Sequence, residues 1–453
     1  MSNPIDSQLK NLYRLSLEDI SLRKVAVLLV SDPVKYMSST TVVYRDGEER
    51  IKLNHELFKS IVAELCLAES MREPLVNLLN PIFMETYKWL KYHGEFLKSK
   101  HSSFDCLEYL KHLQWTHIGT VNYRKTAEAM IRDEMLDIDR RFKLACLYCL
   151  DEDIQNLWHK LSPLSKKRFY NKGRFPRCYL TEEIIIFWTC ILKGRVDKLE
   201  NLLARRVGNY SSIYQQAFEY FANSGYETAT RYFFEKLTCE EKDASLVRTA
   251  KSVAGCVNPS FQPFNDVFCY LLSEMNTEQF QNVLENSSYA ILRSFLDWPR
   301  LDAFPEVAQL ALPYFGEDDY DQLHFFLSQK FKYVYNSAKL FRNLFLITPK
   351  VFRHSTYYLD DFFERKDTEM IKFMFRNMDP EETLELVLSR KALHNCYEQI
   401  REGKLDFVEF FIRESRLSKE DRERFLVALN FYAPSLFELD VGAHFTKLVI
   451  DIP

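Results

Sequence analysis

The stretch Gly403–Glu414, GKLDFVEFFIRE, decides the fold of this chain. Its turn glycine is followed three residues later by Asp406, and apolar residues stand two, five and six positions beyond that acid. This spacing places the apolar side chains on one face of a short helix, with the acid near the positive N-terminal end. The stretch Gly194–Arg205, GRVDKLENLLAR, has the same pattern. We therefore expect a chain assembled from short amphipathic helices.

The acid and its three apolar partners recur at irregular intervals from about residue 116 onward. The seven acids are Glu152, Asp197, Glu227, Glu278, Asp321, Glu369 and Asp406. Consecutive acids are 30 to 51 residues apart, which is the range of helical repeat proteins.

Helix-start signals follow several of these acids by ten to twelve residues. They are Thr238 with Glu241, Ser418 with Asp421, Asp379 before Pro380, and Ser162 before Pro163. Such residues cap the first turn of a helix. A helix followed by a newly capped helix is what a stack of helical hairpins requires.

Composition places limits on the class of protein. The chain has 453 residues, of which 47% are hydrophobic and 27% charged, and only 11 are glycine. These values predict a globular, helical protein. A net charge of −4 gives no overall attraction to nucleic acid or membranes. Apolar runs such as Ile184–Trp188 are too short to span a membrane.

The cysteines and the N-terminus predict the compartment. Ten cysteines are scattered without a framework spacing, which is typical of free thiols in a reducing environment. The first residues, MSNPIDSQLKNLYRLSLEDI, lack the layout of a signal peptide. We therefore expect a soluble intracellular protein in the cytoplasm, with the nucleus as the alternative.

The first part of the chain lacks a clear repeat. We expect residues 1–115 to form a mostly helical cap region and residues 116–453 to form the repeat array. Asp46-Gly47, between two segments of alternating polarity, favours a β-hairpin near residues 40–53, and an irregular loop is the open alternative. Further on, Pro81 is expected to start a new helix.

GKLDFVEFFIRE and GRVDKLENLLAR resemble the second helix of an ankyrin repeat, whose usual run is Gly-x-x-Glu-Val-Val-x-Leu-Leu-Leu. The resemblance extends over about residues 145–415, although the Thr-Pro-Leu-His start and the Gly-Ala-Asp loop of that family are absent from the sequence. It implies an all-α fold, an α-solenoid of about seven irregular helix-turn-helix (ankyrin-like) repeats with an N-terminal helical cap. It also implies recognition of a protein through a concave face.

Motifs for enzyme chemistry are missing from the sequence. It has no Walker or dinucleotide glycine motif and no Gly-x-Ser-x-Gly elbow, and His55-Glu56 is followed by Lys59 where a zinc protease has its second histidine. The one Cys-x-x-Cys, Cys146 to Cys149, is expected to lie inside an apolar helix, Phe142–Leu150, without a second ligand pair, so we expect buried structural cysteines. We accordingly expect no catalytic residue, cofactor or metal.

The segment Lys166–Arg177, KKRFYNKGRFPR, is the one concentrated charge feature. Its basic residues, the candidate partner-binding set, are Lys166, Lys167, Arg168, Lys172, Arg174 and Arg177. With interleaved aromatic rings such a segment could meet phosphates and bases, grip an acidic protein surface, or serve as a solvated connector. Ser252–Asn265, which carries no charge, is expected to be a long irregular insertion.

These observations predict a non-enzymatic scaffold or adaptor that binds a protein partner through the repeat surface. One alternative is a helical-repeat binder of nucleic acid or phosphate that uses residues 166–177. The other is an enzyme whose site is assembled from residues far apart in the sequence. Neither nucleic acid nor a membrane is an expected partner.

Overall fold

The computed structural model describes residues 4–11, 14–31, 57–97, 109–171, 181–199, 212–257, 262–330, 337–353, 355–433, 446 and 449–450. Every regular element in these ranges is a helix, and the one β-type pairing is an isolated bridge between Trp115 and Val121. The predicted all-α class is therefore confirmed. Among the same residues, no helix combines the length and apolar character needed to cross a membrane.

The chain divides into two compact units, Met1–Val307 and Ala308–Pro453. The division falls inside the helix α18 (Phe304–Ala311). The expected boundary near residue 115 between a cap region and a repeat array stays a prediction.

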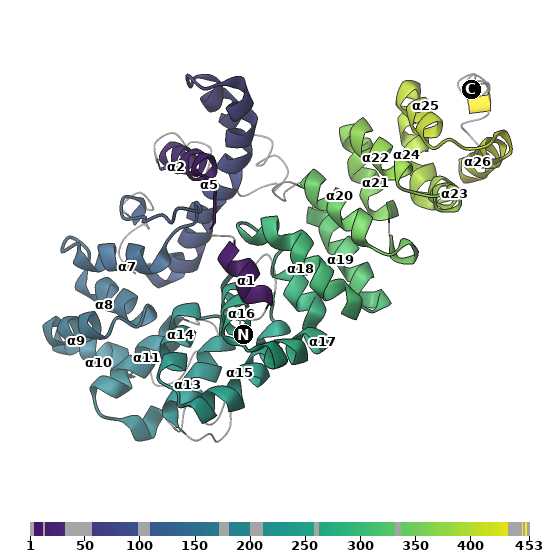
Figure 1. The fold of residues 1–453 in the computed structure, drawn as a ribbon. Helices are drawn as coiled ribbons and strands as arrows, with labels where there is room; N and C mark the ends of the chain where they lie inside the picture. The colour runs from purple at the N-terminus through teal and green to yellow at the C-terminus, as the bar shows by residue number, and fades with distance from the viewer. Residues whose placement is uncertain are drawn as a thin grey trace. The chain divides into compact units, whose positions relative to one another are not determined.

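The first unit consists of short helices that pack as neighbours in pairs (Figure 1). Its elements are α1 (Pro4–Asn11), α2 (Leu17–Val30), α5 (Glu69–Leu97), α7 (Tyr123–Arg132), α8 (Ile138–Leu147), α9 (Asp151–Lys160), α10 (Pro163–Asn171), α11 (Thr181–Leu192), α13 (Ile213–Ala222), α14 (Glu227–Glu235), α15 (Cys239–Ala254), α16 (Gln262–Glu274), α17 (Thr277–Arg293) and η1 (Arg300–Ala303). Helix α2 packs on α5, α8 on α9, and α13 on α14. The N-terminal helix α1 lies against α16 and η1, far along the chain.

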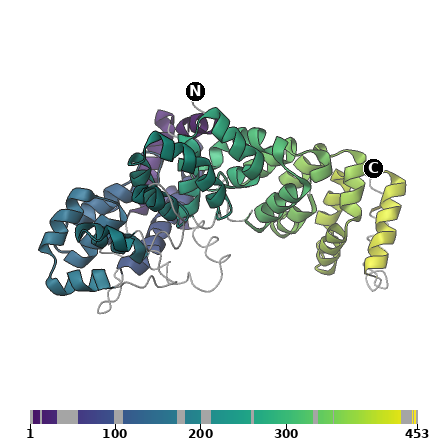
Figure 2. The same ribbon diagram turned by 90° about the horizontal axis from the view of Figure 1, so that it is seen from below.

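The second unit continues with helices that run side by side (Figure 2). Its elements are η2 (Leu312–Tyr314), α19 (Glu317–Lys330), α20 (Ser337–Ile347), η3 (Lys350–Phe352), η4 (Ser355–Tyr358), α21 (Leu359–Arg365), α22 (Thr368–Arg376), α23 (Pro380–Leu388), α24 (Arg390–Arg401), α25 (Leu405–Glu414) and α26 (Lys419–Tyr432). Helix α24 packs against α21, α25 and α26.

The stretch 403–414 forms the predicted turn and helix. Gly403 adopts a left-handed conformation with φ of 75°, and Asp406 lies in the first turn of α25. The three predicted apolar residues, Val408, Phe411 and Ile412, are all buried. Helix α14 begins at its predicted acid, Glu227, and α9, α17 and α22 each begin one residue before theirs, so these acids lie in the first turn. Asp321 is the exception, because α19 begins earlier, at Glu317.

The predicted capping residues are confirmed as well. Thr238 and Asp379 each form a reciprocal capping box with the acid three residues later. Ser418 accepts a hydrogen bond from the backbone N–H of Asp421. Short helices gain about 1 kcal/mol from such a cap, which matters because each helix has few turns of its own.

Two sequence expectations are wrong. Pro81 does not start a helix but lies within α5, which also contains Pro74. Buried residues on both sides, among them Leu79 and Ile82, fix α5 in place, so packing overrides the local effect of proline. The uncharged stretch 252–265 is also not one long insertion, because α15 ends at Ala254 and α16 begins at Gln262. The β-hairpin expected near residues 40–53 lies outside the described residues.

Phe411 provides a test of the buried stripe. Its ring is fully buried, 4.9 Å from the ring of Phe363 and 5.1 Å from that of Phe375, whereas neighbouring Phe410 is only partly buried. Phe411→Ala should lower the free energy of unfolding of the second unit by roughly 3–5 kcal/mol because it leaves a cavity. Phe410→Ala, the matched control, should cost about 1 kcal/mol or less. Urea unfolding followed by circular dichroism measures both losses, and equal losses would contradict a stripe that faces the core.

Candidate functional site

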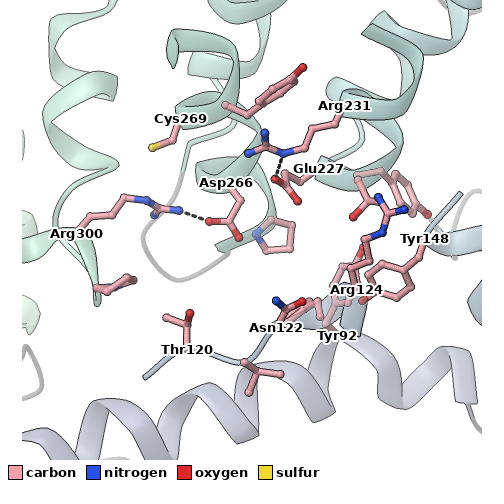
Figure 3. A pocket seen from close by; sticks show the side chains of 18 of the residues that line it. Tyr92, Thr120, Asn122, Arg124, Tyr148, Glu227, Arg231, Asp266, Cys269 and Arg300 are labelled. Atoms are coloured by element: carbon pink, nitrogen blue, oxygen red, sulfur yellow. Dashed lines mark hydrogen bonds and ion pairs between the residues drawn. The ribbon is translucent and has the colours of Figure 1, made fainter. Parts of the chain in front are cut away.

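The first unit contains a pocket with a volume of about 460 Å³, within the size range of small-molecule sites. Its walls come from α1, α5, α8, α14, α16, η1 and the segment that leads into α7 (Figure 3). Segments more than 200 residues apart in the sequence therefore meet around one space.

A tight turn before α7 forms one wall of the pocket. Thr116 donates its backbone N–H to the carbonyl of Thr120 over 2.9 Å, and the two threonine hydroxyl oxygens lie 2.8 Å apart. Gly119, between them, has φ of 83°, and a Cβ there would stand 3.0 Å from Cδ1 of Ile82 in α5. Only glycine therefore fits both the backbone conformation and the close approach to α5.

The same turn is fixed from α2 and then runs into α7. Arg23, which is buried, donates to the carbonyl oxygen of Ile118 over 2.8 Å. Asn122 caps α7 by accepting from the backbone N–H of Lys125 over 2.9 Å. These contacts place Asn122 and the following Arg124 at the pocket.

A second wall comes from the start of α14. Gly225, with φ of 78°, turns the chain into the helix, and Glu227 lies in its first turn. Glu227 forms an ion pair with Arg231 one helical turn later, and the Arg231 guanidinium lies 4.0 Å from the centre of the Tyr270 ring. The acid that the sequence pattern assigns to the helix start thus also faces the pocket.

Asp266 of α16 stands beside Glu227 on the same side of the pocket (Figure 3). It forms an ion pair with Arg300, whose side chain is largely buried. Burial raises the pKa of Asp266 to about 6, and the charge of Glu227 adds to the rise, while Arg300 and Lys88 act against it. Asp266 therefore changes its charge close to physiological pH.

A partly buried ion triad lies near these groups. Lys88 of α5 contacts Glu85 over 3.2 Å and Asp297 over 2.9 Å. Glu85 is almost completely buried, and burial raises its pKa, with Lys88 acting in the opposite direction. Burial alone would lower the pKa of Lys88, but Asp297 and Glu85 raise it above its ordinary value.

Besides Tyr270, four tyrosines complete the lining: Tyr92, Tyr123, Tyr148 and Tyr226. Burial raises the pKa of each above its ordinary value, so all four are neutral phenols at physiological pH. Tyr226 retains only 3% of its exposure, and its hydroxyl has no hydrogen-bond partner among the described residues. A buried hydroxyl without a partner costs free energy, so Tyr226 is a strained element of the pocket wall.

His93 positions Tyr148 in the pocket wall. Nδ1 of His93 lies 2.8 Å from the backbone oxygen of Trp89, and Nε2 lies 2.6 Å from the hydroxyl oxygen of Tyr148. A carbonyl oxygen can only accept, so Nδ1 carries the proton and Nε2 accepts from Tyr148. Burial lowers the pKa of His93 to about 4, which keeps the imidazole neutral.

The candidate partner-binding residues from the sequence lie elsewhere in the first unit. Lys167 is exposed on α10, Lys166 donates to the carbonyl of His159 over 3.3 Å, and Arg168 forms an ion pair with Asp139. The other three candidates, Lys172, Arg174 and Arg177, lie outside the described residues.

The structure adds three basic residues to this region, two from the turn after α11 and one from the helical residues 196–199 that follow it. Lys193 and Lys198 lie 3.9 Å and 4.3 Å from the centre of the Tyr170 ring, and Arg195 contacts the Tyr170 hydroxyl over 3.5 Å. We define the basic surface as Lys166, Lys167, Arg168, Lys193, Arg195 and Lys198. The sequence did not connect the two groups because they become neighbours only through the packing of α10 on α11.

The Cys-x-x-Cys cysteines are buried, as predicted. Helix α8 ends at Leu147, and Cys149 follows in a left-handed conformation with φ of 49°, so the pair is not contained in one helix as expected. Burial raises the pKa of both thiols, which keeps them protonated and unreactive. Within the described ranges, His, Cys, Asp and Glu side chains form no group of three that could hold a metal ion.

The pocket has no signature in the sequence. The sequence pattern includes Glu227 only as an acid at a helix start. The short turn Thr116–Thr120 fits no binding motif. Asp266 and Arg300 are 34 residues apart and share no spacing that predicts a contact. Only the fold brings these groups together.

His93 predicts a specific dependence of stability on pH. The folded protein binds the His93 proton near pH 4, whereas the unfolded chain binds it near its ordinary value of 6.5. The contribution of His93 is therefore complete above the unfolded pKa and is lost as the pH falls toward 4, in total on the order of 3 kcal/mol. Urea unfolding across this range should show the loss in the wild type and not in His93→Gln. The exposed control His394→Gln should follow the wild type, and identical profiles for all three proteins would refute the assignment.

Comparison with known proteins adds no family to this description. No protein-family model matches the chain, and no curated protein matches it either. The resemblance of the stretches 194–205 and 403–414 to ankyrin repeats therefore stays a prediction.

Proposed function

We propose that this protein is a non-enzymatic scaffold that binds an acidic segment of a protein partner through the basic surface. We further propose that its helices form a solenoid of about seven irregular, ankyrin-like repeats with an N-terminal helical cap. In such an array each hairpin packs only on its neighbours, and the exposed turns remain available to partners. The cytoplasm, or alternatively the nucleus, is the proposed compartment.

The observation that carries the proposal is the placement of two lysines around one ring. Lys193 and Lys198 both lie within 4.3 Å of the centre of Tyr170, and neither ammonium has an acidic partner among the described contacts. Two ammonium groups at one ring repel each other. Carboxylates supplied by a partner would relieve this repulsion.

The charge of the basic surface also favours an acidic partner. Two of its six basic residues form ion pairs with acids: Arg168 contacts Asp139, and Arg195 contacts Asp197. The chain as a whole carries a net charge of −4, so this excess is local. A local patch on an acidic protein can recruit a short acidic segment while the remaining surface repels polyanions.

The sequence alternative, a nucleic-acid or phosphate binder, would use the same charges. Nucleic-acid binding through these residues would require stacking on exposed rings as well as phosphate contacts. Tyr170 is already covered by Lys193 and Lys198, which favours the protein partner. An enzyme with an unrecognised site remains the second alternative from the sequence.

A charge reversal tests the proposal. The full-length chain is titrated with a fluorescein-labelled, glutamate-rich peptide and, separately, with a single-stranded oligonucleotide of equal charge, at about 0.15 M salt. Lys193→Glu with Lys198→Glu should weaken peptide binding by about tenfold or more, because attraction becomes repulsion. The control Lys339→Glu with Lys419→Glu makes the same change in net charge on exposed residues of the second unit and should have little effect.

Three outcomes would contradict the proposal. The peptide would fail to bind the wild type, or both double variants would bind it equally well. Tighter binding of the oligonucleotide than of the peptide, with loss only in the Lys193/Lys198 variant, would favour the nucleic-acid alternative.

A further inference from the structure

We propose that the pocket of the first unit binds an organic ammonium group between the carboxylates of Glu227 and Asp266. The inference is independent of the proposed function, because the pocket and the basic surface share no residue. The ammonium could be that of a free polyamine or that of a lysine side chain on a partner, and the test below distinguishes these sources.

The two carboxylates come from different helices and face the same space. Glu227 lies at the start of α14 and Asp266 in α16, and Figure 3 shows both at the centre of the pocket, across from Thr120 and Asn122. Each ion pair uses one carboxylate oxygen, Oε1 of Glu227 with Arg231 and Oδ1 of Asp266 with Arg300. The second oxygen of each can accept a hydrogen bond from a ligand.

The arginines of the pocket do not turn it into an anion site. Arg231 and Arg300 are engaged by Glu227 and Asp266, and Arg124 lies 3.3 Å from Glu128. These pairs also compensate Glu227 and Asp266, but the lining as a whole holds four carboxyl groups, including Asp6 and Glu85, against three guanidinium groups. The arrangement therefore favours a positive ligand.

The tyrosines fit the same ligand. Their ring faces and phenolic oxygens attract ammonium groups, and five of them line the pocket. Tyr92 lies 6.0 Å from Tyr123, centre to centre, so two rings form a continuous aromatic surface on one side.

Electrostatic effects inside the pocket agree with this geometry. The charges of Glu227 and Asp266 both contribute to the raised pKa of Tyr92, after burial itself. Glu227 likewise contributes to the raised pKa of Asp266. The pocket thus disfavours further negative charge, and a bound cation would compensate the carboxylates.

Isothermal titration calorimetry of the full-length protein tests the proposal with four probes: spermidine, the peptide acetyl-Gly-Lys-Gly-amide, inorganic phosphate and glutamate. Saturable binding is expected for one or both amines and not for the two anions. Spermidine binding about tenfold tighter than the peptide would identify a free polyamine as the ligand, and the reverse would identify a partner's lysine. Absence of saturable amine binding, or tighter binding of phosphate or glutamate, would overturn the proposal.

Isosteric variants connect binding to the pocket. Glu227→Gln and Asp266→Asn should each weaken amine binding by about tenfold or more, because each removes one charge from the site. Tyr226→Phe should bind the amine like the wild type and should not lower the thermal midpoint, since the buried hydroxyl has no hydrogen-bond partner among the described residues. Asp318→Asn, at an exposed carboxylate of the second unit, is the matched control. If both carboxylate variants bind like the control, the site lies elsewhere.

The pH dependence of amine affinity distinguishes the loss of the Asp266 charge from a folding defect. Asp266 faces Arg300 of η1, Glu227 of α14 and Lys88 of α5, and its pKa is about 6. Amine affinity should fall severalfold between about pH 7.5 and 5, because Asp266 takes up a proton while the amine stays charged. Asp266→Asn should lose most of this dependence. A wild-type affinity that does not change with pH would contradict the role of Asp266.

Discussion

The contact of Lys88 with Glu85 and Asp297 is the interaction on which the first unit depends. It joins α5 to the segment before η1, across 209 residues of sequence, at 2.9 Å from Asp297. Glu85 is buried, so removal of Lys88 would leave its carboxylate without compensation. In the structure Lys88 contacts both acids, and the contact with Asp297 holds α5 against the segment before η1. Without that closure the pocket would lack the wall that carries Glu85 and Tyr92.

The short helices of the structure are stabilised in the same way. A short helix cannot persist by itself, so each one begins at a cap or a left-handed turn and buries one stripe. Gly225 before α14 and Gly403 before α25 provide the same kind of turn in the two units. In α25 the turn supports only packing among the described residues, while in α14 the first-turn acid also faces a pocket. The first-turn acid of such a helix can therefore also line a pocket where the neighbouring helices leave space beside it.

The sequence predicted the helices well because their signals are local. The stripe of α25, the capping box at Thr238 and the proline-led start of α23 depend on residues within a few positions of one another. It failed at α5, where buried neighbours keep a helix continuous across Pro81. It also could not predict the pocket, because Asp266 meets Glu227 and Arg300 only through the packing of distant helices. Half of the basic surface was missed for the same reason, since Lys193 and Lys198 approach Tyr170 from another segment.

The central claim is that α5 and the later helices of the first unit form one cooperative structure, closed by the Lys88 contact around a preformed pocket. Native-state hydrogen exchange, measured residue by residue in increasing denaturant, tests this claim most directly. The account predicts that amides in the middle of α5, α14 and α16 merge into one opening reaction with a common free energy. Opening of α5 at a free energy several kcal/mol below that of α14 and α16 would contradict it, because the pocket wall would then unfold independently of the rest.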